Sequence, residues 1–166
     1  MADPELTTVT FAFDKAFKGM CSATSEQELR AELSNLLQHL YRLSELVRHR
    51  WKLSRKDPSL DQRVRDAAPG ALGCMWIRNY DAHDIARVAD MADFFSDFFT
   101  EMFGGMAWRP LGEMPFAKRD KEARWRDYEL HLQNRPVLDT TRAAFDGLAS
   151  ILPEESRLRA TSGNQK

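Results

Sequence analysis

The stretch Ser25–Trp51, SEQELRAELSNLLQHLYRLSELVRHRW, decides the fold class because it predicts one long amphipathic helix. Ser25 with Glu28 has the pattern of a capping box, in which side chains satisfy backbone N–H groups at a helix start. Behind it, apolar residues recur at the spacing of one helix face. They are Leu29, Leu33, Leu36, Leu37, Leu40, Leu43, Val47 and Trp51. The next breaker is Asp57-Pro58, so we expect a helix over residues 25–53.

Helical patterns continue along most of the chain. Ser59 is placed to cap a short helix that ends at Pro69-Gly70. We expect further helices over residues 72–102, 118–134 and 140–152, and a loop over residues 106–116. The pattern over residues 72–102 stops at Gly104-Gly105, as is common after a helix C-terminus.

Strand signals are weak. The only candidate is Thr7–Phe13, which has alternating β-formers but no second strand to pair with. We therefore prefer an N-terminal helix or an extended arm there. The predicted fold is all-α, a bundle of about five or six helices, with a single domain over residues 1–152 and a mobile polar tail over residues 153–166.

The composition predicts a soluble protein of the cytoplasm. The chain is 43% hydrophobic and 30% charged, with a net charge of −1. No stretch approaches the roughly 18 continuous apolar residues of a membrane span, and no secretion signal is visible. Cys21 and Cys74 lie far apart, which favours a reducing compartment without disulfides. With two Cys and four scattered His, we expect no structural zinc and no cofactor.

Aromatic residues are concentrated in DFFSDFFTEMF, residues 93–103. Two adjacent Phe residues repeat four positions later, which makes a stripe wider than one core contact needs. One interpretation is a helix that is buried on two sides. The other is a surface that meets a second chain, because apolar surface of this width is seldom left in water. We expect a homodimer on this basis.

Charge is also uneven along the chain. Basic residues dominate from Arg42 to Arg65, and acidic residues dominate from Asp81 to Glu101. The two segments could pair across the bundle. Alternatively, the basic segment collects the phosphates of a polyanion. In that case RNA contacts are expected from Arg50, Lys52, Arg55 and Lys56.

The stretch WIRNYDAHD, residues 76–84, contains Arg78, Asn79 and His83. It resembles the R-x4–6-H motif of HEPN domains, with a polar residue after the Arg. HEPN proteins are small helical domains that usually dimerise, and many are metal-independent ribonucleases of toxin–antitoxin and phage-defence systems. The resemblance implies a similar fold, RNA as substrate, and a partner antitoxin or defence protein. Some HEPN toxins continue the motif to a Tyr that an antitoxin modifies, and Ile85 stands there instead.

The residue types suit RNA cleavage without a metal. Histidine titrates near neutral pH and can transfer the proton of a ribose 2′-hydroxyl. Arginine stays charged and can hold two phosphate oxygens. Asn79 shares a helix face with His83 and could orient it, and Arg87 could add a second cation. On one regular helix, however, Arg78 and His83 would diverge by roughly 140°, so the site needs an irregular backbone or two subunits.

The same spacing occurs twice more, as Arg42-x6-His49 and Arg126-x4-His131. The first pair falls within the long amphipathic helix and is disfavoured for that reason. The second is a serious rival, although its interior is bulky and acidic. Arg78 and His83 are favoured because an apolar approach precedes them and because the small Ala82 would let another chain come close.

Two other functions remain open. His83-Asp84 could be the HD pair of a metal phosphohydrolase, with His49, His131 and Asp127 as further ligands. In a non-enzymatic dimerisation or adaptor module, Arg78, Asn79 and His83 would make only structural hydrogen bonds. RNA cleavage in the presence of a chelator separates these functions from a ribonuclease.

Overall fold

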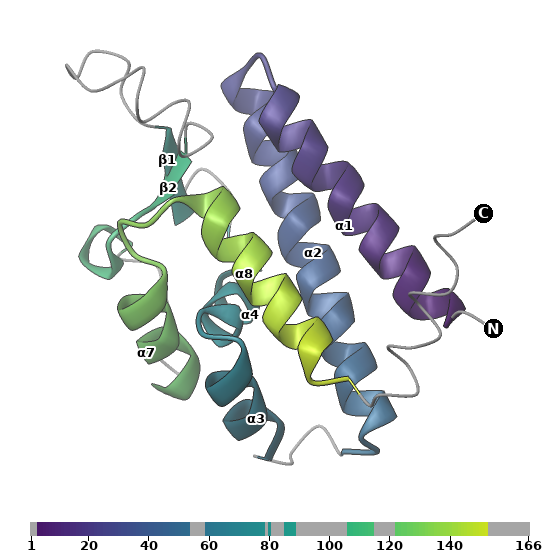
Figure 1. Ribbon diagram of the computed structural model, residues 1–166. Coiled ribbons are helices and arrows are strands. Elements are labelled where there is room, and N and C mark those ends of the chain that lie inside the picture. Colours follow the sequence, from purple (N-terminus) through teal and green to yellow (C-terminus); the bar gives the residue numbers. More distant parts are fainter. Residues whose placement is uncertain are drawn as a thin grey trace.

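The computed structural model describes residues 3–53, 59–78, 80, 85–88, 106–114 and 122–152. Within these residues the chain forms six α-helices, one antiparallel pair of short strands and one 3₁₀ turn (Figure 1). The elements are α1 Pro4–Ser22, α2 Glu26–Arg50, α3 Ser59–Ala67, α4 Ala71–Ile77, β1 Ala86–Val88, β2 Met106–Trp108, η1 Leu111–Glu113, α7 Glu122–His131 and α8 Val137–Ser150. The prediction of a mostly helical fold is confirmed.

The first two helices form an antiparallel hairpin (Figure 1). The Asp3 side chain caps α1 by accepting hydrogen bonds from the N–H groups of Glu5 and Leu6. At the start of α2, the Glu28 N–H donates to Ser25 Oγ at 3.2 Å, as the capping box predicts. The Glu28 carboxylate accepts a hydrogen bond from the Thr24 N–H at 2.7 Å. The predicted helix over residues 25–53 is thus confirmed as α2, and the candidate strand at Thr7–Phe13 lies inside α1.

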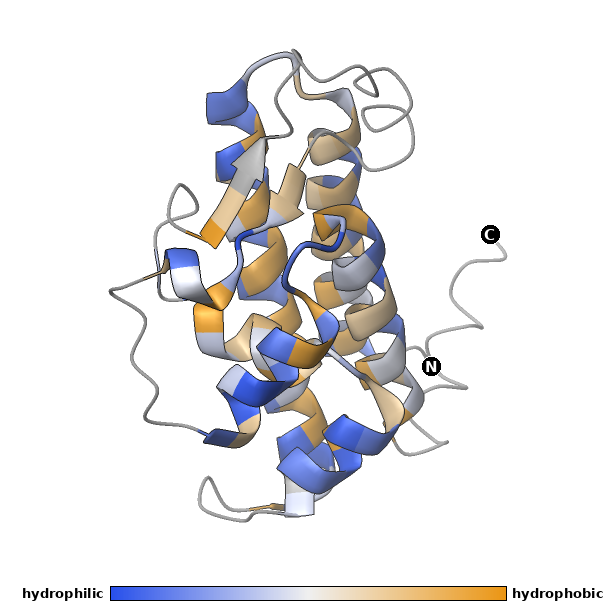
Figure 2. Cartoon of the chain, turned by 90° about the vertical axis from the view of Figure 1, so that its left-hand side faces the viewer, coloured by the Kyte–Doolittle hydropathy of each residue, from blue (hydrophilic) through white to orange (hydrophobic). Residues whose placement is uncertain are grey.

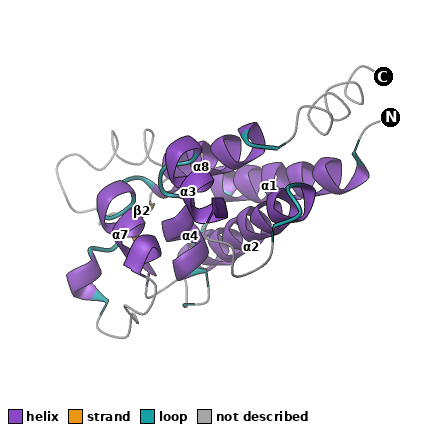
Figure 3. Cartoon of the chain, turned by 90° about the horizontal axis from the view of Figure 1, so that it is seen from below, coloured by secondary structure: helices purple, strands orange, loops and turns teal. Residues whose placement is uncertain are grey.

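The core surrounds α4, whose residues Ala71–Ile77 are all buried. Seen from below, α4 lies among α2, α3, α7 and α8 (Figure 3). The other helices show mixed polar and apolar residues along their length, as expected of helices that bury one face (Figure 2). Gly70 has a positive φ of 88° at the start of α4, so the turn from α3 needs a glycine at this position.

The expected single helix over residues 72–102 is wrong. α4 ends at Ile77, and residues 86–88 form β1, which pairs with β2 so that Ala86 faces Trp108. β2 lies in a segment expected to be a loop. It is fixed from the other side because the Trp108 N–H donates to Arg135 O at 3.1 Å and the Trp108 indole N–H donates to Thr140 Oγ1 at 2.7 Å. Long-range pairing of this kind outweighs the local helical pattern.

The remaining helices follow the predictions with shifted ends. α3 is the short helix expected after Ser59, and α7 ends at His131, near the predicted end at residue 134. α8 begins three residues early, at Val137, directly after Pro136. Residues 93–103 and 153–166 lie outside the described residues, so the phenylalanine stripe and the predicted tail stay predictions. None of the helices in the described ranges is long and apolar enough to cross a membrane.

Candidate functional site

Arg78 lies at the C-terminal end of α4, where its side chain reaches across to α2. Its guanidinium carbon is 3.4 Å from the centre of the Tyr41 ring. At this distance the planar guanidinium must lie nearly parallel to the ring, because an edge-on group would push a nitrogen into it. Arg78 is half-buried, and it has no ion pair with any of the residues that the structure describes. It is therefore a fixed cation without a carboxylate partner there.

The position of Arg78 depends on how the other end of α4 is anchored. The buried Asp127 of α7 accepts a hydrogen bond from the Gly73 N–H at 2.9 Å, and the Gly70 and Leu72 N–H groups also stabilise its ionised form. Burial raises the pKa of the Asp127 carboxyl above its ordinary value, against the opposing effects of these N–H groups and of His131. Asp127 thus acts as a cap from another helix, and α4 is contacted by Asp127 near its N-terminus and by Tyr41, through Arg78, at its C-terminus.

The other two residues of the motif, Asn79 and His83, lie outside the described residues. Tyr80 is described: it lies in a bend, and its N–H donates to Ile77 O at 2.9 Å. The regular helix therefore does not run through the motif. An irregular backbone is what Arg78 and His83 need if they are to meet within one chain, and the bend at Tyr80 is compatible with it. Arg87 pairs with Ala107 in the strand pair, and its side chain is outside the description.

The basic segment from Arg42 to Arg65 is less available to bind phosphate than its sequence suggests. The Arg50 guanidinium lies 2.8 Å from the Asp3 carboxylate and 3.2 Å from the Glu5 carboxylate of α1. A phosphate at Arg50 would have to compete with both of them. Lys52 is exposed and follows α2 with a positive φ of 52°. Arg55 and Lys56 lie outside the described residues.

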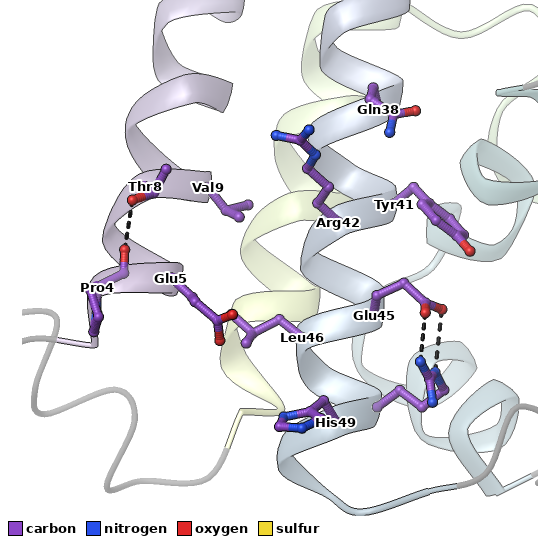
Figure 4. Close-up of a pocket in the computed structure, with 11 residues that line it drawn as sticks. Pro4, Glu5, Thr8, Val9, Gln38, Tyr41, Arg42, Glu45, Leu46 and His49 are labelled. Atoms are coloured by element: carbon purple, nitrogen blue, oxygen red, sulfur yellow. Dashed lines mark hydrogen bonds and ion pairs between the residues drawn. The ribbon is translucent and has the colours of Figure 1, made fainter.

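The two rival Arg–His pairs each line a pocket. Arg42 and His49 are two turns apart on one face of α2, and both line a groove of about 660 Å³ beside α1 (Figure 4). In Figure 4 their side chains point toward α1, while that of Tyr41 points to the other side of α2. Arg126 and His131 line a pocket of about 500 Å³ between α3 and α7. There the His131 Nε2 is 3.9 Å from the Asp127 Oδ1.

The ligands suggested for an HD-type metal site are not brought together in the described part of the chain. His49 lines the α1–α2 groove, whereas His131 and Asp127 line the α3–α7 pocket. Across the described ranges, no group of three or more His, Cys, Asp or Glu side chains is arranged to hold a metal ion. His83 and Asp84 lie outside those ranges.

Tyr41 is the site residue that the sequence did not indicate. It belongs to α2 and Arg78 to α4, and no local pattern connects positions so far apart in the chain. No family model, curated protein or solved structure matches the chain. The resemblance to HEPN domains thus rests on the sequence motif around Arg78 and stays a prediction.

Proposed function

We propose that this protein is a HEPN-like, metal-independent endoribonuclease whose site contains Arg78, His83 and Asn79. The ribose 2′-oxygen attacks the adjacent phosphorus, and the bond from phosphorus to the 5′-oxygen breaks. His83 accepts the 2′-hydroxyl proton, and the leaving 5′-oxygen takes up a proton. The products are a 2′,3′-cyclic phosphate and a 5′-hydroxyl, so the reaction is balanced without an added oxidant, reductant or metal.

The contact between Arg78 and Tyr41 carries this proposal. Stacking uses the face of the guanidinium, whereas its N–H donors lie in the plane of the group. The donors of Arg78 therefore remain available for two phosphate oxygens while the ring fixes their direction. A positioned cation of this kind stabilises the charge that builds up on the phosphate in the transition state.

Comparison with other arginines supports the choice of Arg78. Arg48 is 2.6 Å from the Glu45 carboxylate, and Arg126 is 2.6 Å from the Glu122 carboxylate. Arg50 contacts two carboxylates. Each of these side chains has a carboxylate partner, whereas within the described residues Arg78 contacts an aromatic ring in place of an acid.

The proposal is tested by RNA cleavage in EDTA with the wild type, His83→Ala and Arg78→Ala. Loss of general acid–base help at His83 should lower the rate by about 10²–10⁴-fold. Arg78→Lys should restore little activity, since one ammonium does not replace the two-pronged guanidinium. DNA should not be cut, because it lacks the attacking 2′-hydroxyl.

His49→Ala and His131→Ala are the matched controls, because each removes the histidine of a rival pair. If one of them abolishes cleavage while His83→Ala does not, the catalytic pair is the rival one. If the wild type cuts no RNA in EDTA, the ribonuclease proposal fails.

A non-enzymatic helical module is the second candidate, and the same contact favours it. Arg78 packs on Tyr41 and thereby joins the half-buried end of α4 to α2, which is a sufficient structural reason for an Arg at this position. In that case Arg78→Ala lowers the stability of the fold, and RNA is neither bound nor cut.

For its biological setting we propose a toxin–antitoxin or phage-defence system, in keeping with the HEPN-like motif. Ile85, which stands where some HEPN toxins carry a modifiable Tyr, is fully buried. An antitoxin that adds a group to a hydroxyl has no substrate at this position. Neutralisation would therefore occur by binding of a partner protein rather than by modification of residue 85.

A further inference from the structure

The pocket between α3 and α7 has the features of a binding site that is separate from Arg78. α3 and α7 are joined by the ion pair between Arg124 and Asp61, at 3.4 Å. Beside this pair lies the pocket of about 500 Å³, which is within the usual size range of small-molecule sites. Arg65 lines it from α3, and Arg126, Leu130 and His131 line it from α7.

The charges of the pocket favour an anion. Arg65 is exposed and has no ion pair with any other described residue. Arg126 pairs with Glu122, but both side chains are about two-thirds exposed, at 60% and 66%. Exposed pairs of this kind contribute little free energy, so a ligand can displace Glu122 from Arg126. His131 adds a third group that becomes cationic when it is protonated.

The carboxylate of Asp127, which also lines the pocket, opposes the positive charge of the pocket less than a free carboxylate would. Asp127 is only 3% exposed, and its Oδ2 accepts the hydrogen bond of the Gly73 N–H. Its charge is thus directed to the N-terminus of α4. Its other oxygen, Oδ1, lies 3.9 Å from the His131 Nε2.

Leu130 indicates that the ligand has an apolar part as well as a charged one. It lines the pocket and is 66% exposed, which makes it one of the few large apolar side chains of the described residues that lie open to solvent. A small inorganic anion would leave this surface uncovered. A ligand with a phosphate and an apolar or aromatic group would use both parts of the pocket.

We propose that this pocket binds a phosphate monoester that also carries an aromatic base, as in a nucleoside monophosphate or the 5′-phosphorylated end of an RNA strand. Arg65 and Arg126 hold the phosphate oxygens from opposite sides, His131 donates a further hydrogen bond, and Leu130 contacts the base or sugar. Two guanidinium groups from different helices fit a dianion better than one would. The site does not depend on RNA cleavage at Arg78.

Calorimetric titration of the full chain with three probes tests this inference. The probes are inorganic phosphate, adenosine 5′-monophosphate and a short 5′-phosphorylated RNA, and the last two are each compared with the unphosphorylated form. We expect the nucleotide to bind more tightly than inorganic phosphate and the phosphorylated forms to bind more tightly than the unphosphorylated ones. Preference between the nucleotide and the RNA identifies the source of the phosphate.

Three variants examine the pocket itself. Arg65→Ala and Arg126→Ala should each weaken binding by roughly tenfold or more, the usual effect of losing a charge-assisted hydrogen bond. Glu122→Gln should strengthen binding, because it removes the acid that competes for Arg126. If the ligand did not contact Arg126, Glu122→Gln would not strengthen its binding.

Arg63→Ala is the matched control for Arg65→Ala. Arg63 is on the same helix, but its guanidinium carbon lies 4.3 Å from the centre of the Trp51 ring. This variant should bind the nucleotide as the wild type does. The inference is overturned if no phosphate-bearing probe binds at millimolar concentration. It is equally overturned if Arg65→Ala and Arg126→Ala bind the nucleotide as tightly as the wild type does.

Discussion

Gly73 of α4 crosses Tyr128 of α7 so closely that a Cβ atom on the glycine would lie 2.7 Å from the Tyr128 Cα. The neighbours of this hypothetical atom are the backbone of Tyr128 and the buried side chain of Leu132, which leave no space for it. The close crossing lets the Gly73 N–H reach Asp127 on α7. This helix contact holds the element that presents Arg78.

Gly73→Ala should therefore destabilise the protein, although alanine is the better helix former. Forcing one methyl group into a packed contact typically costs about 1–3 kcal/mol. Gly112→Ala is the matched control, because no atom lies within 4 Å of a Cβ there. Urea unfolding followed by circular dichroism measures both variants, and equal midpoints for the two would contradict the close crossing.

Asp127→Ala should cost about 1–3 kcal/mol, because it leaves the Gly73 N–H without its buried acceptor. Asp127→Asn retains an acceptor and isolates the effect of charge. Burial raises the pKa of the Asp127 carboxyl, so the folded state binds the proton more readily than the unfolded state does. The resulting penalty is full above the raised pKa and disappears as the pH falls to the ordinary value of about 4.

The wild type should accordingly gain stability relative to Asp127→Asn when the pH is lowered from 7 to about 4. Both proteins should carry His131→Ala, because the Nε2 of His131 lies 3.9 Å from the Asp127 Oδ1 and lowers the pKa of that carboxyl. Thermal unfolding at several pH values provides the comparison. A stability difference that does not change with pH, or that changes in the opposite direction, argues against the assigned pKa shift.

Arg50 and Lys52 should behave differently although they are neighbours in the basic segment. Arg50→Glu places a carboxylate next to Asp3, which is 6% exposed and caps α1, so we expect a loss of about 1–3 kcal/mol. Lys52 is exposed, and Lys52→Glu should leave the free energy of unfolding within about 0.5 kcal/mol. If RNA binds along this segment, Lys52→Glu weakens binding and reduces its salt dependence in a folded protein.

The sequence predicted the parts of this fold that local rules determine. α2 followed from the capping box at Ser25 and from the leucine spacing, and the end of α3 followed from Pro69-Gly70. The strand pair could not be predicted, because β1 pairs with a segment that begins at Met106. Trp108 is buried through contacts with the turn between α7 and α8, which no pattern around residue 108 indicates.

In the candidate site, too, local sequence patterns predicted some features, whereas others depend on long-range packing. Arg78 was chosen from its motif, and its place directly after a helix with an apolar sequence agrees with the buried α4. The partner ring of Tyr41 depends on how α2 and α4 pack, so spacing alone could not identify it. The ion pairs of Arg50 with α1 likewise depend on a long-range contact. Basic residues that look equivalent in the sequence therefore differ in their availability to a phosphate.

We expect the protein to be a homodimer, as the wide phenylalanine stripe at residues 93–103 and the HEPN-like motif suggest. Light scattering at micromolar concentration should give a mass near twice the 19.1 kDa of one chain. Replacing Phe95 and Phe99 by Glu should shift the mass toward the monomer, because charge is unfavourable in an apolar interface. A monomer mass for the wild type over the whole concentration range would remove the basis for a shared site.

Tyr41→Leu and Tyr41→Phe separate the role of the aromatic ring from that of the hydroxyl. Phenylalanine keeps a ring beneath the Arg78 guanidinium, whereas leucine removes an interaction worth about 0.5–2 kcal/mol. If the ring positions Arg78 for a phosphate, Tyr41→Leu should slow RNA cleavage and weaken RNA binding, and Tyr41→Phe should resemble the wild type. Arg78→Ala combined with Tyr41→Leu should be no slower than Arg78→Ala alone, since the ring acts only through the arginine. Additive losses in this double-mutant cycle would assign Tyr41 an independent role, and equal activity of Tyr41→Leu and Tyr41→Phe would show that the stacking does not position Arg78 for catalysis.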